Sequence, residues 1–309
     1  MYDLIGDIHG HANELKSLLT KLDYREIDGV WQHPSRQVIF LGDFVDRGPQ
    51  QIETVSIARN MVENGKALAV MGNHEFNAVA WATEDPQNPG EYLRPHTAKN
   101  WKQHRAFLEQ VGEGSDLHHS MIDWFKTLPV YLDLPKLRVV HACWHPEYIA
   151  AIAKYIGTGD QLLAEAWQQT RRKGTDAYEA VEILLKGLEI PLPGDHHFFD
   201  KDNNKRTNIR AEWWRQGSKL TYRDLAMAPK DVIDKIPHEP VASHVLPGYD
   251  GEKPLFVGHY WMSGEPKPLS DHIACLDYSV ASGHGGKLCA YCFDGEQRLD
   301  ASKFVWVDA

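Results

Sequence analysis

"YDLIGDIHGH", residues 2–11, joins a short apolar run to a turn that carries side chains able to bind a metal. The run 2–5 is typical of a buried strand, and Gly6 ends it. A tight turn needs its glycines, Gly6 and Gly10, but it does not need Asp7, His9 or the following His11. These polar side chains therefore point to a function only if similar groups follow the later strands.

Two further strands repeat the same pattern. Residues 37–41 ("QVIFL") and 67–70 ("ALAV") are short apolar runs, and each is followed by a glycine. Apolar residues at helical spacing follow the first two strands, over 15–22 and 52–62. Alternation of strand, turn and helix predicts a parallel α/β layer, and ligands of such layers collect beyond the carboxyl ends of the strands.

The rest of the chain predicts one domain, residues 1–309, with two insertions. Strand-like runs return at 129–142, 254–259, 273–278 and 287–293. The stretch at about 81–127 is polar and proline-containing before it becomes helical in character. The stretch at about 147–235 is helical at first and then rich in aromatic and charged residues, which makes it a candidate cap.

Polar side chains follow five of the expected strands. Each alone has an ordinary explanation, because Asp, Asn and His are common in turns and caps. Random turn chemistry does not explain the whole series, which indicates a shared site at the strand ends. The segments are "GDIHG" with Asp7 and His9, "GDFVDRG" with Asp43, Asp46 and Arg47, "GNHE" with Asn73 and His74, "VVHA" with His141, and "VGH" with His259.

The residue types suit two divalent cations that share a carboxylate. Asp7 and His9 lie two residues apart, so in an extended backbone their side chains point to the same side. Carboxylate plus imidazole binds first-row ions such as Mn, Fe or Zn. The two oxygens of Asp43 can bridge a pair of ions, and Asn73, His141 and His259 can complete the second one. Two such ions activate a water toward phosphorus.

Three further residues suit phosphoryl transfer. The leaving oxygen needs a proton, which His74 is placed to supply beside Asn73. Asp46 can orient the His74 ring, and the planar guanidinium of Arg47 matches phosphate oxygens.

These segments resemble the calcineurin-like metallophosphoesterases. The motif "GDFVDRG", with its arginine, resembles that of the phosphoprotein phosphatase branch and its bacterial relatives, the symmetrical diadenosine tetraphosphatases. The resemblance covers residues 3–76, recurs at 129–142 and 254–293, and is absent from both insertions. It implies an α/β fold, a four-layer αββα sandwich of two β-sheets flanked by helices, with helical insertions.

The same resemblance implies roles for individual residues. Its first metal is held by Asp7, His9 and Asp43, and its second by Asp43, Asn73, His141 and His259. It pairs His74 with Asp46 as the acid and puts Arg47 on phosphate. Trp261 stands where many superfamily members have a further histidine, so we expect water to complete the first metal site. The branch uses a second arginine on the substrate, for which Arg210 and Arg215 are candidates.

The expected function is hydrolysis of phosphomonoesters, as in Ser/Thr phosphatases, by a hydroxide that bridges two divalent metal ions, with Mn preferred and Fe or Zn as alternatives. A symmetrical dinucleoside tetraphosphatase and a catalytically silent metal-binding scaffold are the alternative interpretations. Phosphoproteins, dinucleoside polyphosphates and small phosphoesters all present the same phosphoryl group. The sequence therefore predicts the reaction and leaves the substrate open.

Composition narrows the partners. The chain of 309 residues has 33 basic and 43 acidic residues, a net charge of −10, which argues against nucleic acid as a partner. Lys201, Lys205, Arg206 and Arg210 form the one basic cluster that argues the other way. No signal peptide and no apolar run of membrane-spanning length is visible, so we expect no membrane contact and a cytoplasmic location.

Overall fold

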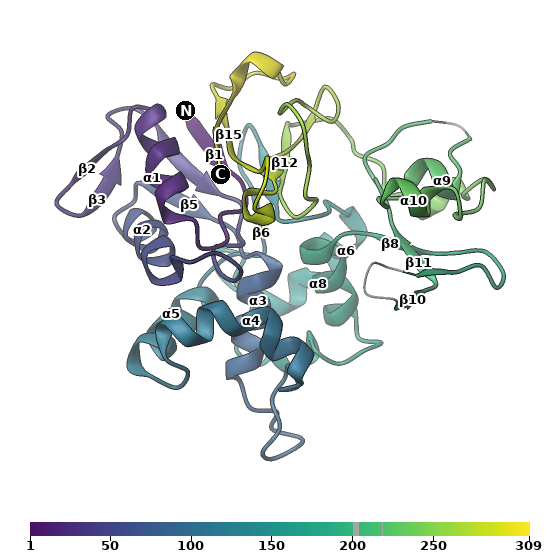
Figure 1. Ribbon diagram of the computed structural model, residues 1–309, viewed down its shortest axis with the longest axis horizontal. Helices are drawn as coiled ribbons and strands as arrows, with labels where there is room; N and C mark the ends of the chain where they lie inside the picture. The colour runs from purple at the N-terminus through teal and green to yellow at the C-terminus, as the bar shows by residue number, and fades with distance from the viewer. Residues whose placement is uncertain (200–203, 218) are drawn as a thin grey trace.

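A computed structural model describes residues 1–199, 204–217 and 219–309, and it shows a mixed α/β fold with several sheets and helices (Figure 1). Lys201 of the basic cluster lies outside the described residues. Among the described residues, no helix is long and apolar enough to cross a membrane.

The larger sheet has six strands and contains the first three predicted ones. Neighbouring strands follow the order β14, β15, β1, β4 and β5, and β16 also pairs with β15. Strands β1, β4 and β5 are parallel, whereas β15 runs antiparallel to β1. The carboxyl ends of the three parallel strands therefore share one edge. The strands are β1 (Tyr2–Ile5), β4 (Gln37–Phe40), β5 (Ala67–Ala69), β14 (Asp277–Tyr278), β15 (Lys287–Phe293) and β16 (Phe304–Asp308).

The second sheet has four strands in the order β13, β12, β7 and β6. Its three neighbours β7, β12 and β13 are parallel, and β6 is antiparallel to β7. The ends of β7 and β12 carry the predicted segments with His141 and His259. These strands are β6 (Tyr131–Asp133), β7 (Arg138–Val140), β12 (Leu255–Val257) and β13 (Ile273–Cys275).

Both sheets contribute to one buried cluster. Leu4 and Ile39 of the larger sheet share it with Val139 and Phe256 of the smaller one. Because strand side chains alternate between faces, the neighbouring Ile5 belongs instead to the core that includes the helices. The parallel strands are thus buried on both faces, as their continuous apolar runs predict.

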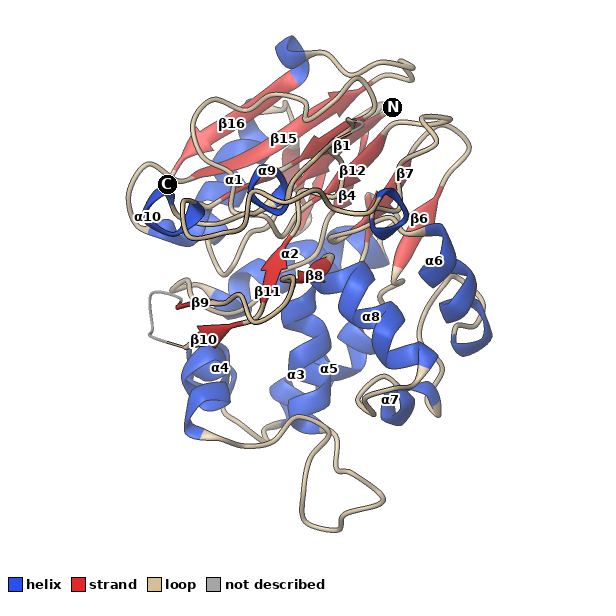
Figure 2. Cartoon of the chain, turned by 90° about the vertical axis from the view of Figure 1, so that its right-hand side faces the viewer, coloured by secondary structure: helices blue, strands red, loops and turns tan. Residues whose placement is uncertain are grey.

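The helices and remaining short elements lie around the sheets. α1 (Ala12–Lys21) and α2 (Gln51–Glu63) are the two helices predicted between the first strands. Figure 2 shows α3, α4, α5 and α8 side by side at the end of the molecule opposite β15 and β16. The other elements include α3 (Asn73–Ala82), α4 (Ala98–Val111), α5 (Asp116–Lys126), α6 (Pro146–Ile152), α7 (Ala166–Gln169), α8 (Asp176–Lys186), α9 (Tyr222–Leu225), α10 (Lys230–Ile233), β2 (Arg25–Ile27), β3 (Val30–Gln32), β8 (Glu189–Pro191), β9 (Phe198–Phe199), β10 (Lys205–Arg206), β11 (Asn208–Arg210) and the 3₁₀ turns at 153–155, 243–245, 280–282 and 301–303.

The insertions differ in content. The first expected insertion contains the end of α3 and then α4 and α5, which agrees with its predicted helical character. Among its described residues, the second contains α6, α7 and α8 but then four short strands in two small sheets, which sequence patterns did not indicate. Strands of two or three residues are too short to give a readable periodicity.

Candidate metal and phosphate site

The turns after five strands bring the predicted metal-ligating side chains together. Oδ2 of Asp43 lies 3.6 Å from Nε2 of His9 and 3.3 Å from Nε2 of His141. Oδ1 of Asn73 lies 3.2 Å from Nε2 of His141 and 2.7 Å from Nδ1 of His259. Residues separated by up to 250 positions therefore share one centre, which is the spatial requirement for a pair of bound ions.

Two groups of side chains offer atoms close enough to hold a cation, and both contain Asp43. One consists of His9, Asp43 and His74, and the other of Asp43, His141 and His259, with all offered atoms within 4.8 Å of one another in each group. The first group contains His74, whereas the sequence predicted Asp7 as the third ligand beside His9 and Asp43. Asp7 adjoins them, because its Oδ2 accepts the backbone N–H of His259 at 3.0 Å.

The buried polar atoms of this cluster fit metal ligands. Oδ1 of Asp7 and Nε2 of His9 and of His259 are buried and have no hydrogen-bond partner among the described residues. His9 Nδ1 donates to the carbonyl of Val45 at 2.9 Å, which leaves the lone pair on Nε2. An outer hydrogen bond that fixes the ring in this way is usual for histidines that bind metals. Bound cations would therefore account for these unpaired atoms.

Electrostatics support the same reading. Burial, together with the charge of His74, lowers the pKa of His9 to about 3, so its ring is neutral as a metal ligand must be. Burial opposes ionisation of Asp43, yet His141 and His74 hold the pKa of this carboxyl well below its usual range. Burial and the nearby Asp277 raise the pKa of Asp7 well above its usual range. Asp7 thus needs a positive partner to remain ionised.

The backbone of the site is strained. Left-handed φ angles cost about 1–3 kcal/mol at non-glycine positions and persist only where the surroundings enforce them. Glu75, the last residue of "GNHE", supplies such enforcement, because its carboxylate accepts the N–H groups of Asp43 and Phe44 at 2.8 Å each and that of Gly72 at 3.1 Å. The left-handed residues are His9 (φ 49°), Asp43 (53°), Asp46 (71°), Arg47 (71°), His259 (71°) and Trp261 (50°).

Two glycines leave the space that the carboxylates occupy. A Cβ atom at Gly72 would lie 2.2 Å from Oδ1 of Asp43, and one at Gly258 would lie 2.1 Å from Oδ1 of Asp7. No side chain could be tolerated at either position without moving a proposed ligand.

His74 is held by Asp46, and Asp46 is held in turn by a residue that sequence reasoning missed. His74 Nδ1 donates to Asp46 Oδ2 at 2.5 Å, while the buried His104 of α4 donates from Nδ1 to Oδ1 at 2.6 Å. Burial works against the imidazolium of His74, but Asp43 and Asp46 outweigh it and raise its pKa. Nothing in the sequence around His104 distinguishes it from an ordinary core histidine.

The predicted phosphate-binding arginines separate into two groups. Arg47 lies beside His74, with Nη2 3.4 Å from Nε2 of the ring, and its guanidinium covers the indole of Trp261 at 4.1 Å. Arg210, the last residue of β11, lines the same pocket. Arg215 is exposed, forms an ion pair with Glu212, and is not among the residues that line the pocket.

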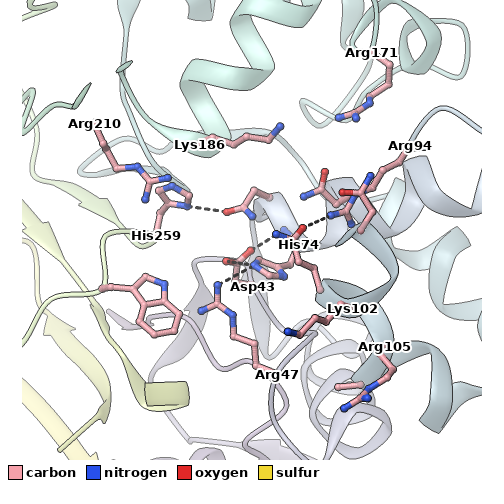
Figure 3. Close-up of a pocket in the computed structure, with 16 residues that line it drawn as sticks. Asp43, Arg47, His74, Arg94, Lys102, Arg105, Arg171, Lys186, Arg210 and His259 are labelled. Atoms are coloured by element: carbon pink, nitrogen blue, oxygen red, sulfur yellow. Dashed lines mark hydrogen bonds and ion pairs between the residues drawn. The ribbon is translucent and has the colours of Figure 1, made fainter. Parts of the chain in front are cut away.

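The pocket of about 610 Å³ beside Asp43 is strongly cationic (Figure 3). Asp43 is the one carboxylate among the described residues that line it, although the chain as a whole carries a net charge of −10. Five of its cations come from the first and second insertions and were not singled out in the sequence. The basic lining residues are Arg47, Arg94, Lys102, Arg105, Arg171, Lys186 and Arg210.

Two proteins with similar sequences are described as asymmetrical bis(5′-nucleosyl)-tetraphosphatases. An asymmetrical bis(5′-nucleosyl)-tetraphosphatase of Oceanobacillus iheyensis is 30% identical over 141 residues, which cover 45% of this chain and 54% of that protein. A protein of the same description from Bacillus subtilis is 42% identical over 146 residues, or 46% and 57% of the two chains. The chain thus spans about half the length of these relatives.

One relative matches over nearly its whole length. A symmetrical bis(5′-nucleosyl)-tetraphosphatase of Hamiltonella defensa is 24% identical over 300 residues, which cover 91% of this chain and 90% of that protein. A solved structure described as a putative diadenosine tetraphosphatase covers 99% of this chain and 92% of its own, with a TM-score of 0.48 and 18% identity.

The family match extends over almost the entire sequence. The family described as calcineurin-like phosphoesterase matches residues 2–284, a range that contains every side chain of the centre described above. The chain belongs to the calcineurin-like phosphoesterases, a family of metal-dependent hydrolases of phosphoric esters.

Proposed function

We propose that this protein hydrolyses a phosphoanhydride bond of a dinucleoside polyphosphate. The observation that carries the proposal is the cationic pocket, in which seven basic side chains line the space beside the proposed metal ligands. A single phosphoryl group needs far fewer cations than this, whereas a chain of phosphates carries several charges in a row. The names of the relatives agree with such a substrate.

This substrate differs from the first expectation. Sequence reasoning put phosphomonoesters first and a dinucleoside tetraphosphate second, because the metal-ligand segments treat both alike. The cations contributed by the insertions reverse that order. Hydrolysis of phosphomonoesters becomes the second candidate, and it draws support from the arginine of "GDFVDRG", Arg47, beside His74.

Two divalent cations are part of the proposal, with Mn as the first choice and Fe or Zn as alternatives. Asp7, His9 and Asp43 would hold one, and Asp43, Asn73, His141 and His259 the other. Cations in such a pair supply Lewis acidity toward phosphoryl oxygens and toward water.

The chain's own side chains complete the chemistry. His74, whose pKa Asp43 and Asp46 raise against the effect of burial, donates the proton on Nε2 to the oxygen that leaves phosphorus. Arg47 and Arg210 donate N–H groups to the oxygens of the reacting phosphoryl group. Burial of the ligand atoms keeps competing water away from the carboxylates.

The proposal includes the architecture expected for the family. Two sheets with helices on both sides, in four layers, would form a single domain over 1–309, with insertions at about 81–127 and 147–235. The buried cluster shared by both sheets supports the layered arrangement. The contribution of Arg210 to the pocket supports the second insertion as a cap.

The test is a comparison of substrates with Mn²⁺ present: diadenosine tetraphosphate, a phosphoserine peptide and an aryl phosphate. We expect the tetraphosphate to have the highest kcat/KM. Asp43→Asn should abolish turnover and reduce bound metal, whereas the control Asp123→Asn, an exposed aspartate on α5, should change neither. A preference for the phosphopeptide would establish the second candidate. Metal binding without turnover of any of the three would establish a silent scaffold.

A further inference from the structure

Three cations from different segments gather on one side of the pocket. Arg94 follows α3, Arg171 follows α7, and Lys186 is the last residue of α8. Two of them pack over the same aromatic ring: the guanidinium of Arg171 and the ammonium of Lys186 lie 5.6 Å and 5.9 Å from the centre of the Phe76 ring. Arg171 Nε also donates to the carbonyl of Leu93 at 3.1 Å, which ties it to the segment of Arg94.

The two arginines of this group have no ion-pair partner within the described residues. Arg94 is only 6% exposed, and its Nη1 is buried without a hydrogen-bond partner, while Nη2 donates to Gln103 at 2.8 Å. No carboxylate of the described residues forms an ion pair with Arg94 or Arg171, and Lys186 pairs with Glu182. Removing a charge from water without a counter-charge is costly, so such a cluster calls for an anion.

The cations also repel one another. Burial lowers the pKa of Arg94 to about 10; the charge of Asp46 opposes this shift, and the charge of Arg171 adds to it. Burial lowers the pKa of Lys186, and Arg171 and Arg94 contribute to that shift as well. Lys186 is the last residue of α8, where the helix dipole stabilises a positive charge, and this explains the position of one of the three cations. It does not account for the two arginines, which follow helices that end before them.

The group lines the same pocket as the proposed reaction centre. Helix α3 begins with Asn73 and His74, and Asn77, one turn later, lines the same pocket as Arg94. One turn advances about 5.4 Å along the axis. In Figure 3, Lys186, Arg171 and Arg94 lie on the side of the pocket away from Arg47, with His74 between them and Arg47. A phosphoryl group at His74 would thus have its neighbours in a linear chain directed toward these cations.

We propose that Arg94, Arg171 and Lys186 form a second phosphate subsite, which binds those phosphoryl groups of a linear polyphosphate that are not being cleaved. The inference rests on the proposed function, because it assigns the uncleaved phosphoryl groups of that substrate to these three side chains. The guanidinium groups present paired N–H donors to phosphate oxygens, and the lysine adds a point charge. Arg47 and Arg210 remain with the phosphoryl group that reacts.

The experiment uses neighbouring arginines as a matched pair. Arg171→Gln removes a charge from the subsite, whereas Arg172→Gln removes one from an exposed guanidinium that donates to Gln87. Binding of inorganic tripolyphosphate and of diadenosine tetraphosphate is measured by calorimetry on metal-free protein, so the result does not depend on turnover. Lys186→Gln is the second variant, because this side chain is also partly exposed and its loss should not prevent folding.

We expect Arg171→Gln and Lys186→Gln each to raise the Kd of both ligands about tenfold, the effect of losing one charge-assisted hydrogen bond. Arg172→Gln should match the unchanged protein. In the presence of Mn²⁺, kcat/KM for the tetraphosphate should fall about tenfold further than kcat/KM for an aryl phosphate. The melting temperature should change little, because each change relieves repulsion between cations while it removes one contact, to Leu93 for Arg171 and to Glu182 for Lys186.

Equal binding of tripolyphosphate by all four proteins would overturn the subsite, and so would a loss confined to the dinucleotide, since that loss would place the nucleoside here. The two proposals fail separately. Absence of any polyphosphate hydrolysis, with tripolyphosphate binding still dependent on Arg171, would reject the proposed function and leave the subsite in place.

Discussion

The two sides of the pocket are built in different ways. On one side, the turns after the strands carry His9, Asp43 and His259 in left-handed conformations, and all three are buried. On the other side, the insertions supply cations such as Arg171 and Lys186 from the ends of helices, partly exposed and with few partners. The reacting centre is therefore fixed by close packing, whereas the substrate-facing wall is held by a few contacts.

This difference separates two questions that one activity assay would merge. Changes on the turn side should alter the rate of the chemical step, whichever phosphoester is supplied. Changes on the insertion side should alter which phosphoester binds. The variants below sharpen the comparison because each is expected to act on one of these quantities more than on the other.

The largest effect is expected for His74→Asn. Loss of a general acid should reduce kcat by about 10²–10⁴-fold. In the unchanged protein, Asp43 and Asp46 raise the pKa of His74, so kcat should fall only as the pH rises through this raised pKa and the proton is lost. Measured kcat against pH should show this decline, and the variant should not. The exposed His119→Asn is the control, and an undiminished kcat in His74→Asn would exclude this role.

A smaller effect is expected for His104→Gln, which tests whether the first insertion also reaches the chemical step. His104 is a positioning residue, because it contacts Asp46 and not the reacting atoms. Losing its hydrogen bond to a carboxylate should lower kcat about tenfold, with a much smaller change in KM. The decisive measurement is a double-mutant cycle with Asp46→Asn. Independent, additive losses would show that His104 acts by another route.

The smallest effect is expected for Trp261→Ala. The indole lies under the guanidinium of Arg47 and is 40% exposed, so the interaction should be worth about 0.5–1 kcal/mol. KM for an aryl phosphate should rise about two- to fivefold, and more than kcat falls. Trp261→Phe, which retains an aromatic face, should restore most of the loss. A phenylalanine variant as weak as the alanine variant would argue against stacking as the reason.

The turn side could be predicted from the sequence, and the insertion side largely could not. Asp43 and Asn73 stand in short segments whose residue types and neighbouring glycines are legible without a structure, and the structure brings them together with the other four candidates. Their roles as ligands stay predictions. Arg94 and Arg171 lie 77 positions apart in segments without a motif, so only the fold brings them together.

The fold shows the same limit. Strand β15 occupies the 287–293 run that the sequence indicated, because seven apolar-rich residues give a clear pattern. The pair β2 and β3 was missed, since three-residue exposed or half-exposed strands have no distinct apolar face. Strand β16 was missed although "FVWV" at 304–307 carries a readable β-branched and aromatic signal. His104 had no such signal, because a buried histidine on an amphipathic helix is commonplace.

The contact between Gly258 and Asp7 has a consequence for assembly of the protein. One residue follows a strand of the small sheet and the other follows the first strand of the large sheet, so this fit exists only after both sheets have docked. Contacts of such long sequence separation form slowly. Any cation that requires the finished centre would then bind the native chain and not its unfolded form, and raise its stability by mass action. Metal uptake would therefore report that the segments around Asp7 and Gly258 have come into contact.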